Sequence, residues 1–386
     1  MRFSCTQENL TQGLMAVSHL ATKNVNLPIL NNILIKAEAE GIKLSATNLE
    51  IGVSSVVRGK VEEEGDFTAP ARVLADYVGF LPKEKIDLVL KEEQLEISCG
   101  SHKTKIKGEA ASEFPVLPQM QKNQPQVVAA SEFLNALQQV VFATAMSESR
   151  PEISGVLLNF QPAEKSLILA ATDSYRLAER KVKINSAGGE NRKVIVPAAT
   201  LQELQRILSG VARGHDTESA TADGNLEIYL SSNQILFVFG NVELISRLIE
   251  GQYPDYAAIL PGSYRTQIIA NVADLTKAVK SASLFVKAGI NDVSLEFKPE
   301  SEVVVSALNA QVGENVSGLE ANINGDPNSI VLNFRYLLDG LQAVGTGEVV
   351  LEVVDNNTPV VLKPVLASAE EGVDRNYLYL IMPIKQ

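Results

Sequence analysis

The sequence predicts an α+β protein built from three copies of one domain. An amphipathic helix followed by alternating strands recurs three times along 386 residues, and equivalent landmarks keep nearly constant offsets. Each helix has a single apolar face to bury, so we expect two helices packed on antiparallel sheets in every copy. The predicted domains span residues 1–122, 126–262 and 264–386.

Each copy opens with the pattern of an amphipathic helix. Apolar residues three and four positions apart lie on one helix face, which can then pack on a sheet. The residues of these faces are Leu10, Leu14, Val17 and Ala21 in the first copy; Phe133, Leu134, Leu137, Val140 and Val141 behind the N-cap Ser131 in the second; and Leu275, Ala278, Val279 and Ala282 in the third.

A pair of alternating strands follows each helix and ends at a short polar residue. These residues are Asn48, Asp173 and Asn309, which stand 125 and 136 positions apart. Side chains of this kind bond to their own backbone and favour a tight turn after a strand. We therefore expect the same turn in all three copies.

A second strand then leads into a second helix. Pro70, Pro197 and Asn333 stand at this junction, and each residue type is favoured where a helix begins. Polar segments marked by proline or glycine, Gln121–Pro125 and Pro261–Tyr264, separate the three copies.

The overall composition limits the class of protein. The net charge of −12 argues against a protein that coats DNA by electrostatics, although a local basic surface inside an acidic body stays open. The chain lacks an apolar run long enough for a membrane helix, and its first residues do not resemble a signal peptide. Two cysteines, Cys5 and Cys99, are too few for a disulfide framework, so we expect a reducing cytoplasm and two buried thiols, with a single bridge between them as the alternative.

The sequence contains no recognisable catalytic or metal-binding motif. His19, His102 and His215 are scattered without other ligands at metal-binding spacing, and the run 62–64 of glutamates is typical of a solvated turn. We expect no metal, no cofactor and no catalytic residue. An enzyme that uses spatially paired carboxylates stays an alternative, because such pairing leaves no sequence signal.

The polar faces of the six helices lean towards lysine, arginine and glutamine. Arg72, Lys277, Lys280 and Arg335 are examples, whereas much of the acidic character falls in the strand regions. Such faces could contact phosphates without reading bases, or they could simply be solvated. Composition alone favours solvated faces.

Five motifs in order resemble the bacterial DNA polymerase III beta subunit family, the sliding clamps, along the whole chain. They are Leu27–Asn32, Ala171–Ala178, Tyr253–Tyr256, Asn333–Asp339 and Tyr379–Ile384. The resemblance implies clamp-type domains that close a ring as a head-to-tail homodimer around duplex DNA. It implies a non-enzymatic processivity factor that tethers the replicative polymerase, the clamp loader and other proteins carrying a short motif. An acidic interaction scaffold that does not encircle DNA is the alternative.

The resemblance also implies a partner-peptide pocket between the second and third domains. Its residues would be Ile153, Thr172, Ser174, Tyr175, Arg176, Leu177, Pro254, Ile259, Ile290, Asn333, Tyr336, Pro359, Leu380, Ile381, Met382 and Pro383. Ser174, Tyr175 and Ala258 depart from the common family pattern and bear on which motif the pocket prefers.

Two further surfaces follow from the same resemblance. Implied DNA contacts are Lys23, Asn24, Arg72, Ser149, Arg150 and Lys193. Implied dimer contacts are Ile106 on the first domain against Leu284 and Phe285 on the third.

Overall fold

The computed structural model describes residues 1–21, 27–146, 149–185, 190–213, 224–287, 289–298, 301–366 and 372–385. Lys23 and Asn24 lie outside these residues. The chain packs into two compact units: Met1–Leu134 with Ile184–Gly189 and Ala199–Leu248, and Asn135–Lys183 with Glu190–Ala198 and Ile249–Gln386. The predicted central domain therefore contributes strands to both units.

The first unit contains two antiparallel sheets. The smaller sheet has the order β5-β1-β7-β8-β9, with β1 (Arg2–Thr6), β5 (Gly59–Glu63), β7 (Lys85–Lys91), β8 (Gln94–Cys99) and β9 (His102–Lys107). The larger has the order β10-β15-β16-β17-β4-β3-β2-β6, with β2 (Asn32–Glu38), β3 (Gly41–Thr47), β4 (Ile51–Val57), β6 (Gly65–Pro70), β10 (Gln126–Ala129), β15 (Asn225–Leu230), β16 (Gln234–Phe239) and β17 (Val242–Arg247).

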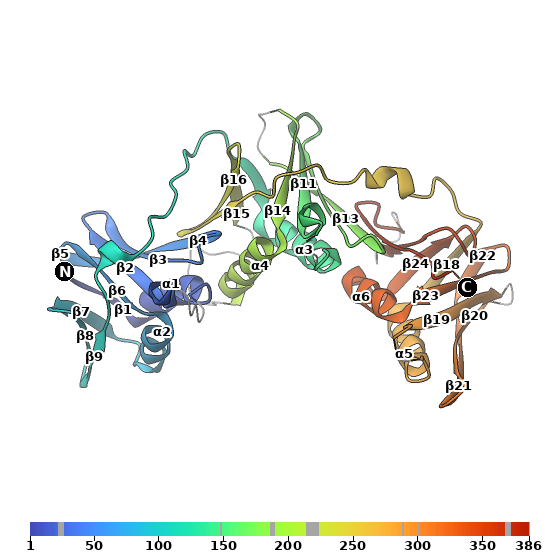
Figure 1. Ribbon diagram of the computed structural model, residues 1–386, viewed down its shortest axis with the longest axis horizontal. Helices are drawn as coiled ribbons and strands as arrows, with labels where there is room; N and C mark the ends of the chain where they lie inside the picture. The colour runs from blue at the N-terminus through green and yellow to red at the C-terminus, as the bar shows by residue number, and fades with distance from the viewer. Residues whose placement is uncertain are drawn as a thin grey trace. The chain divides into compact units, whose positions relative to one another are not determined.

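Helices of the first unit bury the apolar faces that the spacing predicts. In α1 (Gln7–Val17), Leu10, Leu14 and Val17 are buried, and the helix packs beside α2 (Ala71–Phe80) (Figure 1). The helix ends at Val17, so the expectation that Ala21 belongs to its apolar face is wrong. Of the central-domain helices, α4 (Ala198–Arg213) belongs to this unit from Ala199 onward, whereas α3 (Ala130–Val140) passes from the first unit to the second after Leu134.

The second unit also contains two antiparallel sheets. The larger has the order β14-β11-β12-β13-β26-β25-β24-β18-β22, with β11 (Gly155–Gln161), β12 (Ser166–Thr172), β13 (Arg176–Lys183), β14 (Arg192–Pro197), β18 (Thr266–Asn271), β22 (Asn322–Gly325), β24 (Glu348–Val353), β25 (Val360–Pro364) and β26 (Tyr377–Ile381). The smaller has the order β21-β20-β19-β23, with β19 (Asp292–Lys298), β20 (Glu302–Asn309), β21 (Gly313–Glu320) and β23 (Asn328–Asn333).

Helices α5 (Val272–Ser283) and α6 (Phe334–Val344) complete the second unit (Figure 1). The predicted apolar face of α5 is buried, and Asn333 begins α6 by accepting a bond from the Arg335 backbone N–H. A Cβ at Gly340 of α6 would lie 2.3 Å from the Tyr379 ring, so glycine lets this helix approach β26 closely.

The predicted fold class is confirmed: three repeats each place two helices against antiparallel sheets. Strand pairing across the repeats was not predicted. In the first unit β4 pairs with β17, and in the second β13 pairs with β26. None of the helices in the described ranges combines the length and the apolar character needed to cross a bilayer.

Candidate functional site

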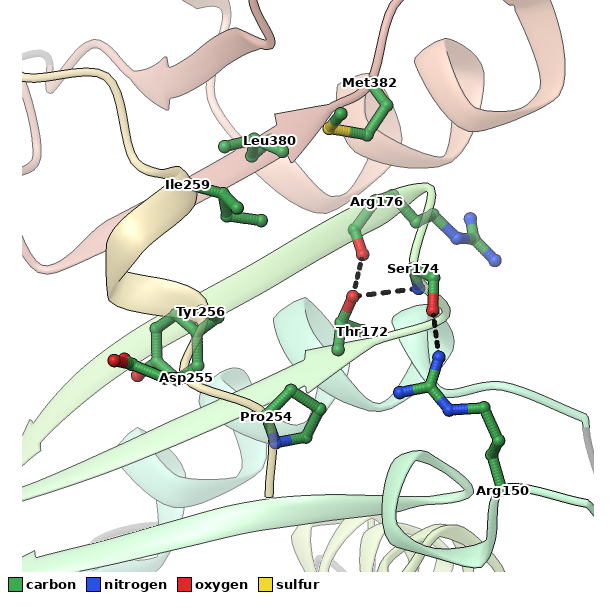
Figure 2. A pocket seen from close by; sticks show the side chains of 10 residues that line it. All are labelled: Arg150, Thr172, Ser174, Arg176, Pro254, Asp255, Tyr256, Ile259, Leu380 and Met382. Carbon is green, nitrogen blue, oxygen red and sulfur yellow. Dashed lines mark hydrogen bonds between the residues drawn. The ribbon is translucent and has the colours of Figure 1, made fainter. Parts of the chain in front are cut away.

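An apolar pocket of about 130 Å³ opens where β13 pairs with β26 in the second unit (Figure 2). Four segments supply its walls: the turn between β12 and β13, the segment 254–259, the end of β26, and Arg150 before β11. The pocket is lined by Arg150, Thr172, Ser174, Arg176, Pro254, Asp255, Tyr256, Ile259, Leu380 and Met382.

The turn between β12 and β13 is fixed by its own side chains. The Thr172 hydroxyl donates to the Arg176 carbonyl at 2.6 Å and accepts from the Ser174 N–H at 3.1 Å. Asp173 Oδ1 accepts from the backbone N–H groups of Tyr175 and Arg176 at 2.9 and 3.0 Å. Four local bonds thus hold this wall in one shape, as the short polar residue at Asp173 predicts.

Arg176 lies in this wall, but its guanidinium is bonded to three oxygen atoms of the protein itself. Its Nε donates to Asp173 at 2.9 Å and its Nη1 donates to Asp339 of α6 at 2.6 Å. The third nitrogen, Nη2, donates to the Phe142 carbonyl at 3.0 Å. Figure 2 shows the guanidinium pointing away from Ile259 and Leu380. Arg176 therefore joins the turn to α6.

Aromatic rings surround the Arg176 guanidinium. It lies 4.7 Å from the ring centre of Tyr336 and 5.4 Å from that of Phe142. Tyr336 in turn stacks on the exposed Tyr175, with ring centres 6.5 Å apart. Cation–π contacts of this kind add to the ion pairs and keep the turn against α6.

The floor of the pocket is apolar. Leu177, Val361 and Leu380 form a buried cluster, and Leu177 and Leu380 are direct cross-strand partners. Tyr256, Leu260, Leu378 and Met382 pack against this cluster. An apolar floor beside a flexible methionine suits the capture of apolar side chains.

The segment 253–259 forms the wall opposite the turn. The Tyr253 hydroxyl accepts from the Thr172 backbone N–H at 3.1 Å, and the Tyr256 hydroxyl donates to Glu179 Oε2. Burial, followed by the charge of Glu179, raises the pKa of Tyr256, so its phenol stays protonated as a donor. Burial also raises the pKa of Glu179, and the bond from Tyr256 opposes that shift.

One side of the pocket is crossed by a polar contact. Arg150 Nη1 donates to the Ser174 hydroxyl at 2.9 Å, and Arg150 Nε donates to Glu152 at 3.1 Å. The Arg150 side chain is 48% exposed, so its bonds compete with water. Ligand pockets usually enclose about 300–1,000 Å³, so this cavity is smaller than most of them.

The structure brings seven of the predicted pocket residues together around one cavity: Thr172, Ser174, Arg176, Pro254, Ile259, Leu380 and Met382. Leu177 lies below them in the floor, and Ile381 is buried opposite Arg176 in the strand register. Outside the cavity wall stand Ile153, Tyr175, Ile290, Asn333, Tyr336, Pro359 and Pro383.

Three lining residues were not assigned to the pocket by the sequence. Arg150 was expected at DNA, whereas Asp255 and Tyr256 lay inside a recognised motif from which only Pro254 was carried over. A signal existed for Tyr256, because two tyrosines three residues apart, Tyr253 and Tyr256, flank that proline.

The remaining predicted residues lie on other surfaces. Arg72 is exposed on α2 with Asp76 at 3.6 Å, Lys193 is exposed on β14, and Ser149 precedes Arg150. Ile106 is buried on β9, whereas Leu284 is 75% exposed just after α5 and is followed by Phe285. In the described part of the chain, no group of three His, Cys, Asp or Glu side chains could hold a metal.

Comparison with known proteins gives consistent matches over the whole chain. Residues 1–118, 127–255 and 257–385 match the family models of the N-terminal, central and C-terminal domains of the DNA polymerase III beta subunit. The beta sliding clamp of Synechococcus elongatus is 32% identical over 391 residues, covering 100% of this chain and 99% of that one. The Staphylococcus aureus beta sliding clamp is 31% identical, covering 97% and 96%.

Solved structures agree with these relatives. The DNA polymerase sliding clamp from Bacillus subtilis has a TM-score of 0.88 at 26% identity, covering 100% of this chain and 99% of that one. The sliding clamp of Pseudomonas aeruginosa bound to griselimycin has a TM-score of 0.88 at 25% identity, covering 100% of both chains.

Proposed function

The chain belongs to the DNA polymerase III beta subunit family, and from that premise we propose that it encircles duplex DNA and tethers the replicative polymerase to its template. It is an accessory processivity subunit without catalytic activity of its own. This proposal is supported above all by the match of all three family domains in order along one chain.

The pocket at the β13–β26 seam is proposed as the site for partner proteins. Its floor offers apolar side chains, which suits a short linear motif with apolar anchors. The replicative polymerase and the clamp loader would bind there in turn. Arg150 belongs to this pocket in our assignment, since its guanidinium is bonded to Ser174.

A ring requires contacts between two copies of the chain. Strands β9 and β21 each stand at the edge of a sheet, so each can accept one further strand. β9 carries Lys103, Lys105 and Lys107, whereas β21 carries Glu314 and Glu320. Opposite charges on two free edges support a head-to-tail homodimer in which β9 of one copy pairs with β21 of the other, with Ile106, Leu284 and Phe285 nearby.

DNA would be held by topology, so the net charge of −12 is no obstacle. Sequence-independent contacts are proposed for Lys23, Asn24, Arg72, Ser149 and Lys193, of which Arg72 and Lys193 are exposed. Cys5 and Cys99 are free and buried, which supports a cytoplasmic location.

Primer extension on primed circular single-stranded DNA, with the cognate polymerase and clamp loader, tests the function. Adding the chain should lengthen the products made in one binding event, and an unchanged product length would refute the proposal. Gel filtration with light scattering tests the ring, for which we expect twice the 41.7 kDa mass of one chain.

A further inference from the structure

Two phenols attach the segment 253–259 to the sheet below it. Tyr253 accepts a bond from the backbone of β12, at Thr172, and Tyr256 donates to the side chain of Glu179 on β13. Pro254 and Asp255, which line the pocket, lie between these two attachment points. The position of this wall therefore depends on two hydroxyl groups.

Tyr256 has a second role in packing. Its ring contacts the cluster of Leu157, Ala170, Ile195 and Tyr253 and also the floor cluster of Leu177, Val361 and Leu380. After Tyr256 the segment forms only the short 3₁₀ helix Tyr256–Ile259, which leads to the lining residue Ile259. A rotation of the Tyr256 ring would thus move the wall on both of its sides.

Glu179 is the only charged partner that the described residues bring to the Tyr256 hydroxyl. It sits half-buried on the same face of β13 as Leu177, two residues away, with Ala170 of β12 and Leu378 of β26 opposite it in the register. Lys181 of the same strand and Asp255 of the wall are the charges nearest this pair. A carboxylate in such apolar surroundings is fixed by the one hydroxyl that reaches it.

We propose that Glu179 is a positioning residue for partner-peptide binding: through its hydrogen bond to Tyr256 it fixes the wall formed by Pro254, Asp255 and Ile259. Glu179 does not line the pocket itself. The inference rests on the proposed function, because it assigns this residue to the same pocket.

Peptide affinity in four variants tests the inference. The probe is a fluorescein-labelled decapeptide from the replicative polymerase of the same organism that carries its clamp-binding motif, measured by fluorescence anisotropy. Y256F and E179A each remove the bond, and we expect Kd to rise about three- to tenfold, the effect of one hydrogen bond. E179Q keeps an oxygen acceptor for the hydroxyl, and its Kd should stay within about twofold of the wild type.

Tyr229 supplies a matched control. Its hydroxyl donates to Glu227 at 2.6 Å in the first unit, so Y229F removes the same kind of bond without touching the pocket. Y229F should leave Kd unchanged, and urea unfolding of every variant shows whether it is folded. A Kd near the wild-type value in E179Q, together with an unchanged Kd in Y229F, supports the assignment of Glu179 as a positioning residue.

Two other outcomes overturn the inference, and they differ in what else they refute. If the wild type binds the peptide and Y256F binds it equally well while unfolding more easily, the bond is only structural and the proposed function stands. If the wild type does not bind the peptide at all, the assignment of the pocket fails and the inference fails with it.

Discussion

The turn that follows β3 is built like the turn that follows β12, yet only the second borders the apolar pocket. In the first, the Thr47 hydroxyl donates to the Ile51 carbonyl at 2.8 Å, and Asn48 Oδ1 accepts from two backbone N–H groups. This repeats the bonds of Thr172 and Asp173, and the third turn residue has a φ of 78° in both. The shared backbone therefore does not create the site.

We call the pairing of β4 with β17 the first seam and the pairing of β13 with β26 the second seam. The residues that form the floors of the two seams explain the difference. Gly52 faces Ile245 where β4 pairs with β17, whereas Leu177 faces Leu380 where β13 pairs with β26. A Cβ at Gly52 would lie 2.9 Å from Leu117 Cδ2, so Leu117, near the end of the first domain, rests where the second seam has a leucine side chain. Leu117 therefore covers the floor of the first seam at Gly52, whereas the floor of the second seam is open to the pocket.

The first seam still contains a cavity, of about 660 Å³, but its walls are charged. Five of its lining residues are Lys36, Glu38, Lys43, Asp66 and Glu243. Lys122 from the linker is bonded to Glu243 at 2.6 Å across it. A larger volume with mixed charges suits apolar anchors less well than a small apolar floor, and side chains rather than size separate the two seams.

Replacing Arg176 should have the largest effect on the free energy of unfolding. The first turn has Ile51 at the equivalent position, which provides a matched comparison. R176M leaves Asp173, 14% exposed, without its guanidinium, and we expect the free energy of unfolding to fall by about 3–5 kcal/mol. The matched change I51V should cost about 1 kcal/mol. Urea titration followed by circular dichroism measures both free energies of unfolding. A loss below about 1 kcal/mol for R176M would contradict the role of Arg176 in joining the turn to α6.

A charge introduced beside each seam compares the two seams directly. Ile259 is 44% exposed and lines the pocket, whereas Val116, which lines the cavity at the first seam, is 95% exposed. I259D should weaken binding of the labelled peptide by at least about 30-fold, or roughly 2 kcal/mol, because an aspartate would meet the apolar anchors. V116D should leave Kd unchanged in the same anisotropy titration. Equal losses in both would mean that the first seam also binds the peptide.

The repeat and the helix faces could be predicted because they depend on local periodicity. Leu275, Ala278, Val279 and Ala282 are buried together in α5, as their spacing requires. The pocket was reached only through family motifs, since Thr172 and Leu380 are brought together by strand pairing that leaves no mark in either segment.

The orientation of Arg176 could not be predicted at all. Its partners Asp339 and Phe142 stand 163 and 34 residues away, and Tyr256 stands 77 residues from Glu179. Contacts over such distances depend on how sheets and helices pack, which no local pattern encodes. For the same reason, the strand pairs that join neighbouring repeats could not be predicted from the sequence.

Filling the floor of the first seam should have a moderate effect. G52L places a side chain where Leu117 rests, and displacing Leu117 should lower the free energy of unfolding by about 1–2 kcal/mol. G52A should cost less, because only the end of the Leu117 side chain must move. Urea unfolding compares the two, and a G52L protein as stable as the wild type would show that Leu117 does not seal this seam.

The smallest effects are expected at the turn residues with left-handed backbone, Ser174 and Leu49. Glycine adopts a φ of 78° without strain, so S174G and L49G should each raise the free energy of unfolding by up to about 1 kcal/mol. S174G also removes the oxygen that accepts from Arg150, and releasing this contact should lower the peptide Kd about two- to threefold. L49G should not change Kd, because Leu49 lies in the other unit. An unchanged Kd in S174G would mean that the Arg150 contact does not restrict entry to the pocket.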